Sequence, residues 1–271
     1  MPENPAMPAP ITLLTDFGSR DIYVGTLKGV IARIAPQAVV IDLNHEIAPQ
    51  DVLAASFNLR MAYRYFPDGT VHVAVVDPGV GTPRRAIALQ TPQGYFVGPD
   101  NGLFSGVLAE TTVLAAVELN HPVYWRSPQP SQTFHGRDIF APAGAYLAKG
   151  TPLALLGTAV DLATLKRLPE VGYTPTEAGL SGTVQYIDRF GNLITSIPNR
   201  VLGQKQWQRK WVVHLDILEI KAVQAYAEQP AGELVALMGS HGWVEIAISC
   251  GSAAADLKAA VGDPVEVCWI D

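Results

Sequence analysis

The first hundred residues alternate between short apolar runs and longer segments with helical spacing, and this alternation constrains the fold more than any other feature. The apolar runs lie at residues 11–14, 38–43, 71–76, 86–91 and 94–97. The segments 23–36 and 51–66 place apolar side chains three and four positions apart, and Asp51 is a suitable N-cap for the second. Strands that are apolar throughout are typical of parallel sheets with helices on both faces. The sequence therefore predicts a Rossmann-like α/β domain with a largely parallel sheet.

The pattern changes beyond residue 168. Residues 169–178 lack periodicity and are rich in Pro, Gly and Thr, which is typical of a linker. The chain then shows short alternating or β-branched runs separated by turns, which predict a smaller antiparallel β-barrel with one helix at 254–261. Residues 1–10 contain four prolines and are expected to form a flexible tail. We therefore divide the rest of the chain into an N-terminal α/β domain at 11–168, the linker, and a C-terminal β-barrel domain at 179–271.

Charge and hydropathy exclude several classes of partner. The net charge of −6 opposes binding to nucleic acid or to anionic membranes, which require basic surfaces. The basic segment 205–210 is expected to be a solvated hairpin tip. The N-terminus lacks the regions of a secretion signal, and no apolar run is long enough to span a bilayer. We expect a cytoplasmic protein that binds neither nucleic acid nor a membrane.

The two cysteines, Cys250 and Cys268, both lie in apolar, strand-like sequence near the C-terminus. Neither a CxxC spacing nor a Cys/His knuckle is present, which disfavours a structural zinc site. We expect two buried free thiols in a reducing compartment.

Polar loops follow four of the predicted strands. They read TDFG after 11–14, NHEIAPQD after 38–43, DPGVG after 71–76 and GPDNG after 94–97. Because ligands bind at the carboxyl ends of the strands in α/β sheets, these loops predict a ligand site at one edge of the sheet. A second dense polar cluster, QTFHGRDIFAP, occupies residues 132–142.

The loop VVDPGVGTPRR, residues 75–85, is the most unusual of these segments. Its two prolines stiffen it, while Gly79 and Gly81 let it double back, so Asp77 and Arg84 are predicted to face one another. Such a pair is either a staple for the loop or part of an active site.

Two kinds of chemistry fit the polar loops. One is a metal site that activates water, with ligands drawn from Asp16, His45, Asp77, Asp100, His135 and Asp138. The other is a metal-free triad of Asp77, Arg84 and His135 that positions and polarises a water. The remaining histidines His72, His121 and His214 are interpreted as structural or solvated. Residue spacing alone leaves both chemistries open and indicates no substrate.

Five longer motifs resemble a known family. They are LLTDFGSRDIYVGTLKG, VVDPGVGTPRR, GPDNGLF, FHGRDIFAPAGA and DRFGNLITSI, in the family's order. Together they resemble the S-adenosyl-L-methionine (SAM) hydroxide adenosyltransferases, once called the DUF62 family and related to the fluorinating and chlorinating SAM enzymes. The resemblance implies hydrolysis of SAM to adenosine and L-methionine by a homotrimer with sites at subunit interfaces.

The resemblance also implies residue roles in the first domain. Asp77, Arg84 and His135 match the family's water-activating triad. Asp16 matches the acid that holds both ribose hydroxyls, which suits a carboxylate that accepts two hydrogen bonds.

In the second domain the resemblance implies further substrate contacts. Asp188 and Asn192 match residues that take the methionine amine and the adenine edge. Ser240 matches a serine that contacts the methionine carboxylate, and Cys250 matches backbone that lines the adenine.

On this resemblance the reaction needs neither a metal nor another cofactor, because the sulfonium makes methionine a good leaving group at the ribose C5′. The intact triad favours hydroxide over halide as the nucleophile. His241 and Gln50 stand where the halogenating relatives carry an arginine and an aromatic residue. Two alternatives stay open: a sensor module that binds SAM or adenosine with little turnover, and a metal-dependent hydrolase that uses the same acidic loops.

Overall fold

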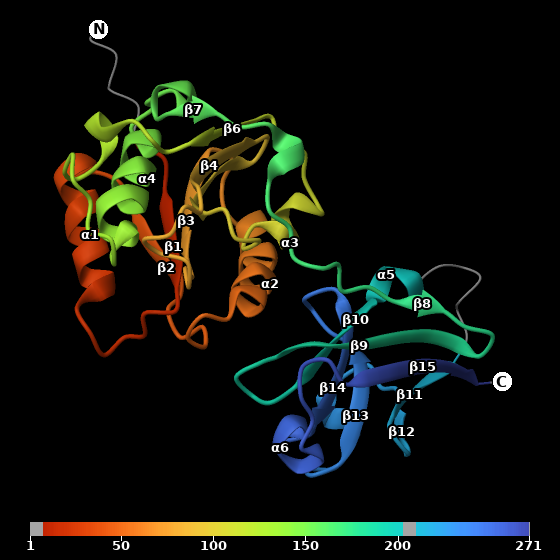
Figure 1. Cartoon of the computed structure of the whole chain (residues 1–271). Coiled ribbons are helices and arrows are strands. Elements are labelled where there is room, and N and C mark those ends of the chain that lie inside the picture. Colours follow the sequence, from red (N-terminus) through yellow and green to blue (C-terminus); the bar gives the residue numbers. More distant parts are fainter. Residues whose placement is uncertain (1–7, 203–209, 271) are drawn as a thin grey trace, which may run out of the picture. The chain divides into compact units, whose positions relative to one another are not determined.

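A computed structural model describes residues 8–202 and 210–270 of the chain. The described residues form two compact units, one ending at Leu168 and the other beginning at Pro169 (Figure 1). Most of the expected tail at 1–10 and of the expected hairpin tip at 205–210 lies outside the described residues.

The first unit alternates strands with helices. Its strands are β1 (Ile11–Thr15), β2 (Val40–Asn44), β3 (Thr70–Val75), β4 (Ala86–Thr91), β5 (Gly94–Pro99), β6 (Ala115–Glu118) and β7 (Thr158–Ala159). Its α-helices are α1 (Tyr23–Ile34), α2 (Val52–Ala62), α3 (Ser105–Leu108) and α4 (Ala141–Ala148). Shorter helical turns are η1 (Tyr63–Tyr65), η2 (Pro122–Tyr124), the π-helical η3 (Gly136–Phe140), η4 (Leu153–Leu155) and η5 (Leu162–Thr164). Asp51 caps α2 as expected, because its carboxylate accepts from the Ala54 amide at 2.8 Å.

These strands form one mixed sheet in the order β2-β1-β3-β5-β4-β6-β7. The pairs among β2, β1, β3 and β5 are parallel, whereas the pairs from β5 through β4 and β6 to β7 are antiparallel. The prediction of a largely parallel sheet is therefore right for one half of the sheet and wrong for the other. The reason is visible between β4 and β5, where Pro92 and Gln93 alone form the connection, and so short a turn can join only antiparallel strands.

Helices cover both faces of this sheet. Figure 1 shows α1 and α4 on one side of the strands and α2 and α3 on the other. Leu27 of α1 shares a buried cluster with Val73 of β3, and Leu59 of α2 shares another with Ala74, the next residue of the same strand. Because successive side chains of a strand point to opposite faces, a strand covered on both sides is mostly apolar rather than alternating.

The second unit consists mainly of strands. They are β8 (Thr174–Pro175), β9 (Gly179–Ile187), β10 (Leu193–Pro198), β11 (Lys210–Leu215), β12 (Leu218–Lys221), β13 (Leu234–Met238), β14 (Trp243–Ile248) and β15 (Pro264–Ile270). The helices are α5 (Asn199–Leu202), α6 (Ala253–Leu257) and the 3-10 turn η7 (Tyr226–Glu228). Helix α6 is shorter than the expected 254–261, because Lys258 takes a left-handed conformation (φ 54°) at its C-terminal end.

The strands of this unit form a nearly closed antiparallel sheet in the order β12-β11-β15-β9-β10-β14-β13, with β8 paired to β9. An isolated bridge between Ala222 and Ala236 links the two edge strands, β12 and β13. Side chains such as Val213, Ile246 and Val267 fill the interior. The result is a barrel-like unit, as expected from the short alternating strands.

The helices within residues 8–202 and 210–270 lack the combination of length and apolar character that crossing a membrane requires.

Candidate active site

The loop between β3 and β4 brings Asp77 and Arg84 together because of the direction of β4. Strand β3 ends at the same edge of the sheet at which the antiparallel β4 begins, so a short loop can return to its starting point. Gly81 has φ +77°, and a Cβ atom there would lie 2.4 Å from the Gln132 carbonyl oxygen. The loop therefore needs glycine at this position to pack against the segment that leads to His135. Gly79 has no positive φ, so only one of the two glycines supplies the expected reversal.

Asp77 and Arg84 form a two-point ion pair. Arg84 Nε donates to Asp77 Oδ1 at 2.8 Å, and Arg84 Nη2 donates to Asp77 Oδ2. The two side chains are only 6% and 10% exposed, respectively. The guanidinium carbon also lies 5.3 Å from the centre of the Phe140 ring, which is fully buried. This double fixation holds the guanidinium in one orientation.

His135 completes the arrangement. Arg84 Nη2 lies 2.9 Å from His135 Nδ1, and because a guanidinium can only donate, Nδ1 accepts and the ring proton resides on Nε2. Burial lowers the pKa of His135 below its ordinary 6.5 and the Arg84 charge lowers it further, while Asp77 and Asp138 oppose the shift. The imidazole is therefore neutral near pH 7. His135 immediately precedes the π-helical turn η3, a type of irregularity often found at functional sites.

Asp16 follows β1 at the same edge of the sheet. The Gln50 amide donates to Asp16 Oδ2 at 2.8 Å, with Gln50 itself at φ 69°. Phe17, Tyr23 and Phe134 pack edge to face with ring centres 5.5–5.9 Å apart. Since Phe17 adjoins Asp16 and Phe134 adjoins His135, this aromatic cluster connects the two polar groups. The composition of the loops did not indicate it.

Two acids considered as metal ligands, Asp100 and Asp138, are paired with arginines instead. Asp100 is 3% exposed and accepts from Arg85 Nε at 2.9 Å and from the Lys166 amide at 2.9 Å. Asp138 is 1% exposed and accepts from Arg126 and Arg137. Burial alone raises the pKa of the Asp138 carboxyl, but the hydrogen bonds outweigh burial and hold the pKa well below its usual range. Both carboxylates therefore organise the loops.

His45 is also committed to neighbours in the first unit. Its Nδ1 lies 2.8 Å from Thr15 Oγ1, and its Nε2 lies 3.0 Å from Asp42 Oδ1. His72, expected to be structural, is buried in the sheet, where Nδ1 lies 2.8 Å from Thr12 Oγ1. The candidate ligands thus belong to several separate clusters, and Asp77, Arg84 and His135 form one of them.

In the second unit, Asp188 and Asn192 lie in the turn between β9 and β10. Asp188 Oδ1 accepts from the Phe190 and Asn192 amides at 2.9 Å each, and Asp188 Oδ2 accepts from Asn192 Nδ2 at 3.1 Å. A Cβ atom on Gly191 (φ +82°) would lie 2.0 Å from Ser252 Oγ. The turn is thus rigid and rests on the start of α6.

Ser240 and Cys250 lie beyond opposite ends of β14. Cys250 sits in a turn next to Ser252, with φ 59°, whereas Ser240 lies in the turn between β13 and β14. Both residues are exposed. The prediction of a buried thiol is therefore wrong for Cys250, because the residue follows the buried strand and occupies the turn. Cys268 is half-buried.

Sequence reasoning missed a buried polar cluster around Glu245, whose side chain is 4% exposed. Tyr226 donates to Glu245 Oε1 at 2.6 Å, and His241 Nε2 lies 2.9 Å from Glu245 Oε2. Burial raises the pKa of the Tyr226 phenol, and Glu245 and Asp188 raise it further. A glutamate within the apolar run WVEIAI was the available signal.

Comparisons with known proteins agree with these motifs. Residues 11–157 match the SAM hydroxide adenosyltransferase N-terminal domain, and residues 182–266 match the corresponding C-terminal domain. A protein from Salinispora arenicola named (R)-S-adenosyl-L-methionine hydrolase is 41% identical over 95% of this chain and 97% of its own. A fluorinase from an Actinoplanes species is 32% identical over 69% of this chain and 71% of its own.

The fold agrees as well. A crystal structure of an uncharacterized conserved protein from Thermotoga maritima superposes with a TM-score of 0.89 at 38% identity, covering 95% of this chain and 99% of that one. The chain belongs to the SAM hydroxide adenosyltransferase family.

Proposed function

We propose that this chain is an enzyme that hydrolyses S-adenosyl-L-methionine to adenosine and L-methionine by in-line attack of water on the ribose C5′, with no metal and no other cofactor. The observation that carries the proposal is the hydrogen-bonded set of Asp77, Arg84 and His135. It is supported by the (R)-S-adenosyl-L-methionine hydrolase from Salinispora arenicola, which is 41% identical to the chain over the 258 aligned residues.

The proposed roles of the three residues follow from the hydrogen-bond donors and acceptors that they have left to bind a water. The Asp77 carboxylate keeps lone pairs beyond its bonds to Arg84 and accepts a hydrogen of the attacking water. His135 carries its proton on Nε2, and this N–H donates a hydrogen bond to the water oxygen. Arg84 holds both groups in place. Positioning a water in line with the scissile bond removes an entropic cost that otherwise raises the barrier.

The bond changes balance without an electrophile. The C5′–O bond forms as the C5′–S bond breaks, the bonding pair passes to sulfur, and the sulfonium becomes the neutral thioether of methionine. The water proton passes to Asp77 and then to solvent. Attack on a sulfonium by a water that is losing its proton to Asp77 cancels charge, so the apolar rings of Phe17 and Phe134, which adjoin Asp16 and His135, favour it.

The absence of a metal from this proposal rests on the donors that are already engaged. An arginine donates to each of the carboxylates of Asp77, Asp100 and Asp138. The guanidinium group therefore already neutralises the carboxylate that a metal ion would have to bind. A metal-dependent hydrolase would need these acids free.

The proposed substrate contacts use both units. In the first unit, Asp16 holds the ribose hydroxyls through the carboxylate that Gln50 positions. In the second unit, Asp188 takes the methionine amine and Asn192 takes the adenine edge.

The remaining proposed contacts lie in the turns before and after β14. Ser240 contacts the methionine carboxylate, and the backbone at Cys250 lines the adenine. We extend the (R) configuration at sulfur from the named relative to this chain.

We further propose a cytoplasmic homotrimer in which the second unit of one subunit completes the site of its neighbour. Dilution to demonstrably monomeric protein should then weaken SAM binding. Unchanged affinity in the monomer would overturn the interface location without touching the reaction.

The first test is a chromatographic assay of purified protein with (R)-SAM and EDTA, run beside Asp77→Ala and the control Asp100→Asn. Adenosine and methionine in equal amounts with wild type, and far less with Asp77→Ala, are the expected result. Activity that EDTA abolishes and Zn²⁺ or Mg²⁺ restores would indicate the metal-dependent alternative. Tight SAM binding by calorimetry without adenosine above background would indicate a sensor module.

A further inference from the structure

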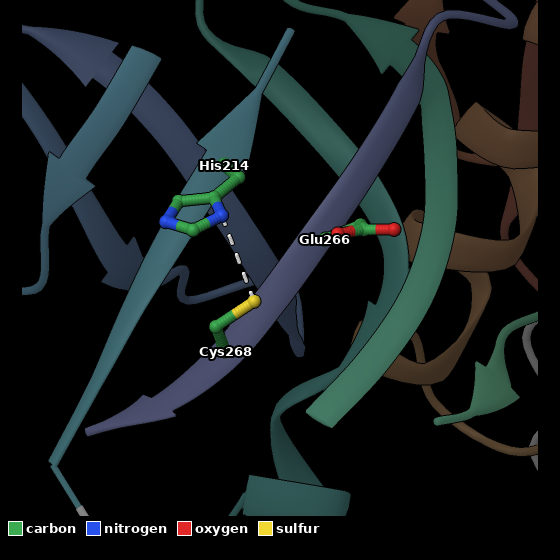
Figure 2. A group of neighbouring side chains, drawn as sticks. All are labelled: His214, Glu266 and Cys268. Atoms are coloured by element: carbon green, nitrogen blue, oxygen red, sulfur yellow. Dashed lines mark hydrogen bonds between the residues drawn. The ribbon is translucent and has the colours of Figure 1, made fainter. Parts of the chain in front are cut away.

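Three side chains able to bind a metal meet on the second unit, away from the residues proposed for hydrolysis. His214 lies on β11, and Glu266 and Cys268 lie on the neighbouring strand β15, with His214 directly opposite Glu266 in the register. Val213 and Val267, which alternate with them, are buried in the barrel core. The three side chains therefore belong to the outer face of the sheet (Figure 2).

The spacing of the donor atoms suits a small tetrahedral ion. One ligand atom from each of the three residues lies within 4.8 Å of the other two. His214 Nδ1 and Cys268 Sγ are 3.7 Å apart, joined by the dashed line in Figure 2. Zinc–sulfur and zinc–nitrogen bonds at a tetrahedral angle separate the two ligand atoms by about 3.6 Å. The distance between the imidazole nitrogen and the sulfur therefore matches the distance expected for two ligands of one zinc ion.

The histidine also has the support that metal ligands require. His214 Nε2 lies 3.3 Å from Glu219 Oε2 on β12, so the ring N–H points to a carboxylate and the lone pair on Nδ1 faces Cys268. A histidine that binds zinc usually donates its second nitrogen to a carboxylate in this way. Glu219 thus orients the His214 ring so that Nδ1 faces Cys268.

The local charge favours a cation. The Glu266 and Glu219 carboxylates place negative charge close to the Cys268 thiol and the His214 ring. Without a cation the sulfur keeps its proton and shares it with His214 Nδ1. A divalent ion would replace that proton and neutralise the surrounding negative charge.

We propose that His214, Cys268 and Glu266 form a binding site for Zn²⁺ or a similar thiophilic divalent cation, with Glu219 orienting His214. His214 Nδ1, Cys268 Sγ and one Glu266 oxygen bind the ion, and a water takes the fourth position. Binding releases one proton, from the Cys268 thiol to solvent. The ion clamps β11 to β15. The proposal does not depend on the hydrolase function, because none of these residues takes part in the proposed reaction.

Among the described residues this is the one group of three or more closely spaced metal-ligating side chains. Its members come from strands far apart in the sequence, so no CxxC or Cys/His motif marks the group. The proposal adds metal binding to the interpretation of His214 as a structural or solvated residue.

The test uses tag-free, full-length protein, reduced and freed of metal. Co²⁺ should bind in one equivalent and give the thiolate-to-cobalt charge-transfer band of a cysteine ligand, and Zn²⁺ should displace it. Cys268→Ser should lose the band, whereas Cys250→Ser, which removes the other, exposed thiol, should retain it. Glu219→Gln should weaken Zn²⁺ binding by about tenfold to a hundredfold and keep the band.

A second measurement needs no substitution and so avoids variants that fail to fold. In wild-type protein Zn²⁺ should slow alkylation of Cys268 by iodoacetamide and leave Cys250 unaffected, as read by peptide mass spectrometry. Equal alkylation of Cys268 with and without Zn²⁺, or an unchanged cobalt band in folded Cys268→Ser, would overturn the proposal.

Discussion

The consecutive arginines Arg84 and Arg85 each pair with an aspartate beyond the end of a strand, yet the two pairs have different surroundings. Arg85 binds Asp100, donates to the Thr164 hydroxyl and carbonyl at 2.9 and 2.7 Å, and shares Asp100 with the Lys166 amide. Arg84 binds Asp77, lies over the Phe140 ring and donates its further side-chain hydrogen bond to the ring nitrogen of His135.

The difference separates a structural pair from a reactive one. Main-chain groups and a hydroxyl complete the Asp100 pair, so each partner has its hydrogen bonds within the loops. A neutral imidazole completes the Asp77 pair, and its other nitrogen keeps a proton to donate. An ion pair at a strand end therefore indicates an active site only when the surrounding residues leave hydrogen-bond donors and acceptors available to a substrate or a water.

The largest expected effect comes from removing the charge of Asp77. Asp77→Asn keeps the size of the side chain but loses the acceptor for the water proton, so kcat should fall by about 10²–10⁴-fold. The rate of adenosine release at saturating SAM measures it. A loss smaller than threefold, with native circular dichroism, would mean that Asp77 is another loop staple.

The matched change in the other pair should affect stability. Asp100→Asn leaves the Arg85 charge without its buried partner, and the unfolding free energy should fall by about 3 kcal/mol. Urea denaturation measures the change. At temperatures where the variant is folded, its kcat should stay within a few fold of wild type. A selective loss of kcat without a loss of stability would erase the contrast between the pairs.

The sequence predicts the pair of Asp77 and Arg84. It does not predict that the neighbouring Arg85 pairs with Asp100, or which of the two pairs is reactive. The glycines and prolines around 78–83 predict that the chain returns, and the structure brings Asp77 and Arg84 into contact. No local pattern distinguishes Arg84 from Arg85, because Asp100 reaches Arg85 only through the antiparallel pairing of β4 with β5. That pairing is also where the expectation of a parallel sheet is wrong.

The same limit explains the unpredicted clusters. His214 and Cys268 are 54 positions apart and meet through the register of β11 and β15. Glu245 of β14 contacts Tyr226 of the turn η7 and His241 of the turn that precedes β14. Periodicity predicts which face of a strand is buried, but strand order and register decide which polar side chains become neighbours.

A smaller effect tests the geometry of the arginine. Arg84→Lys keeps the charge but replaces the planar fork with one ammonium, which cannot hold both Asp77 oxygens and His135 Nδ1 together. Loss of one charge-assisted hydrogen bond, about 1.5–3 kcal/mol, corresponds to a roughly tenfold to hundredfold fall in kcat/KM. Arg85→Lys is the control and should change kcat/KM by less than threefold. Equal losses in both variants would show that the contact with His135 has no special weight.

The smallest expected effect is on the pH profile of kcat/KM. Burial and Arg84 lower the pKa of His135 below 6.5, so the ring stays neutral above pH 6.5 and gains a proton only as the pH falls further. A protonated Nδ1 could no longer accept from Arg84, so activity should be flat from pH 8 to 6.5 and decline below it. An acid limb with its midpoint above 6.5 would contradict the neutral imidazole.

Acid unfolding must be separated from this limb, because His72 is buried with a pKa lowered to about 4. Since the unfolded chain binds that proton near pH 6.5, the stability that neutral His72 contributes is present above pH 6.5 and is lost as the pH falls from 6.5 toward 4. Circular dichroism at each pH identifies where the fold is intact. Within that range, Asp100→Asn should show the same acid limb as wild type, because its pair does not touch His135.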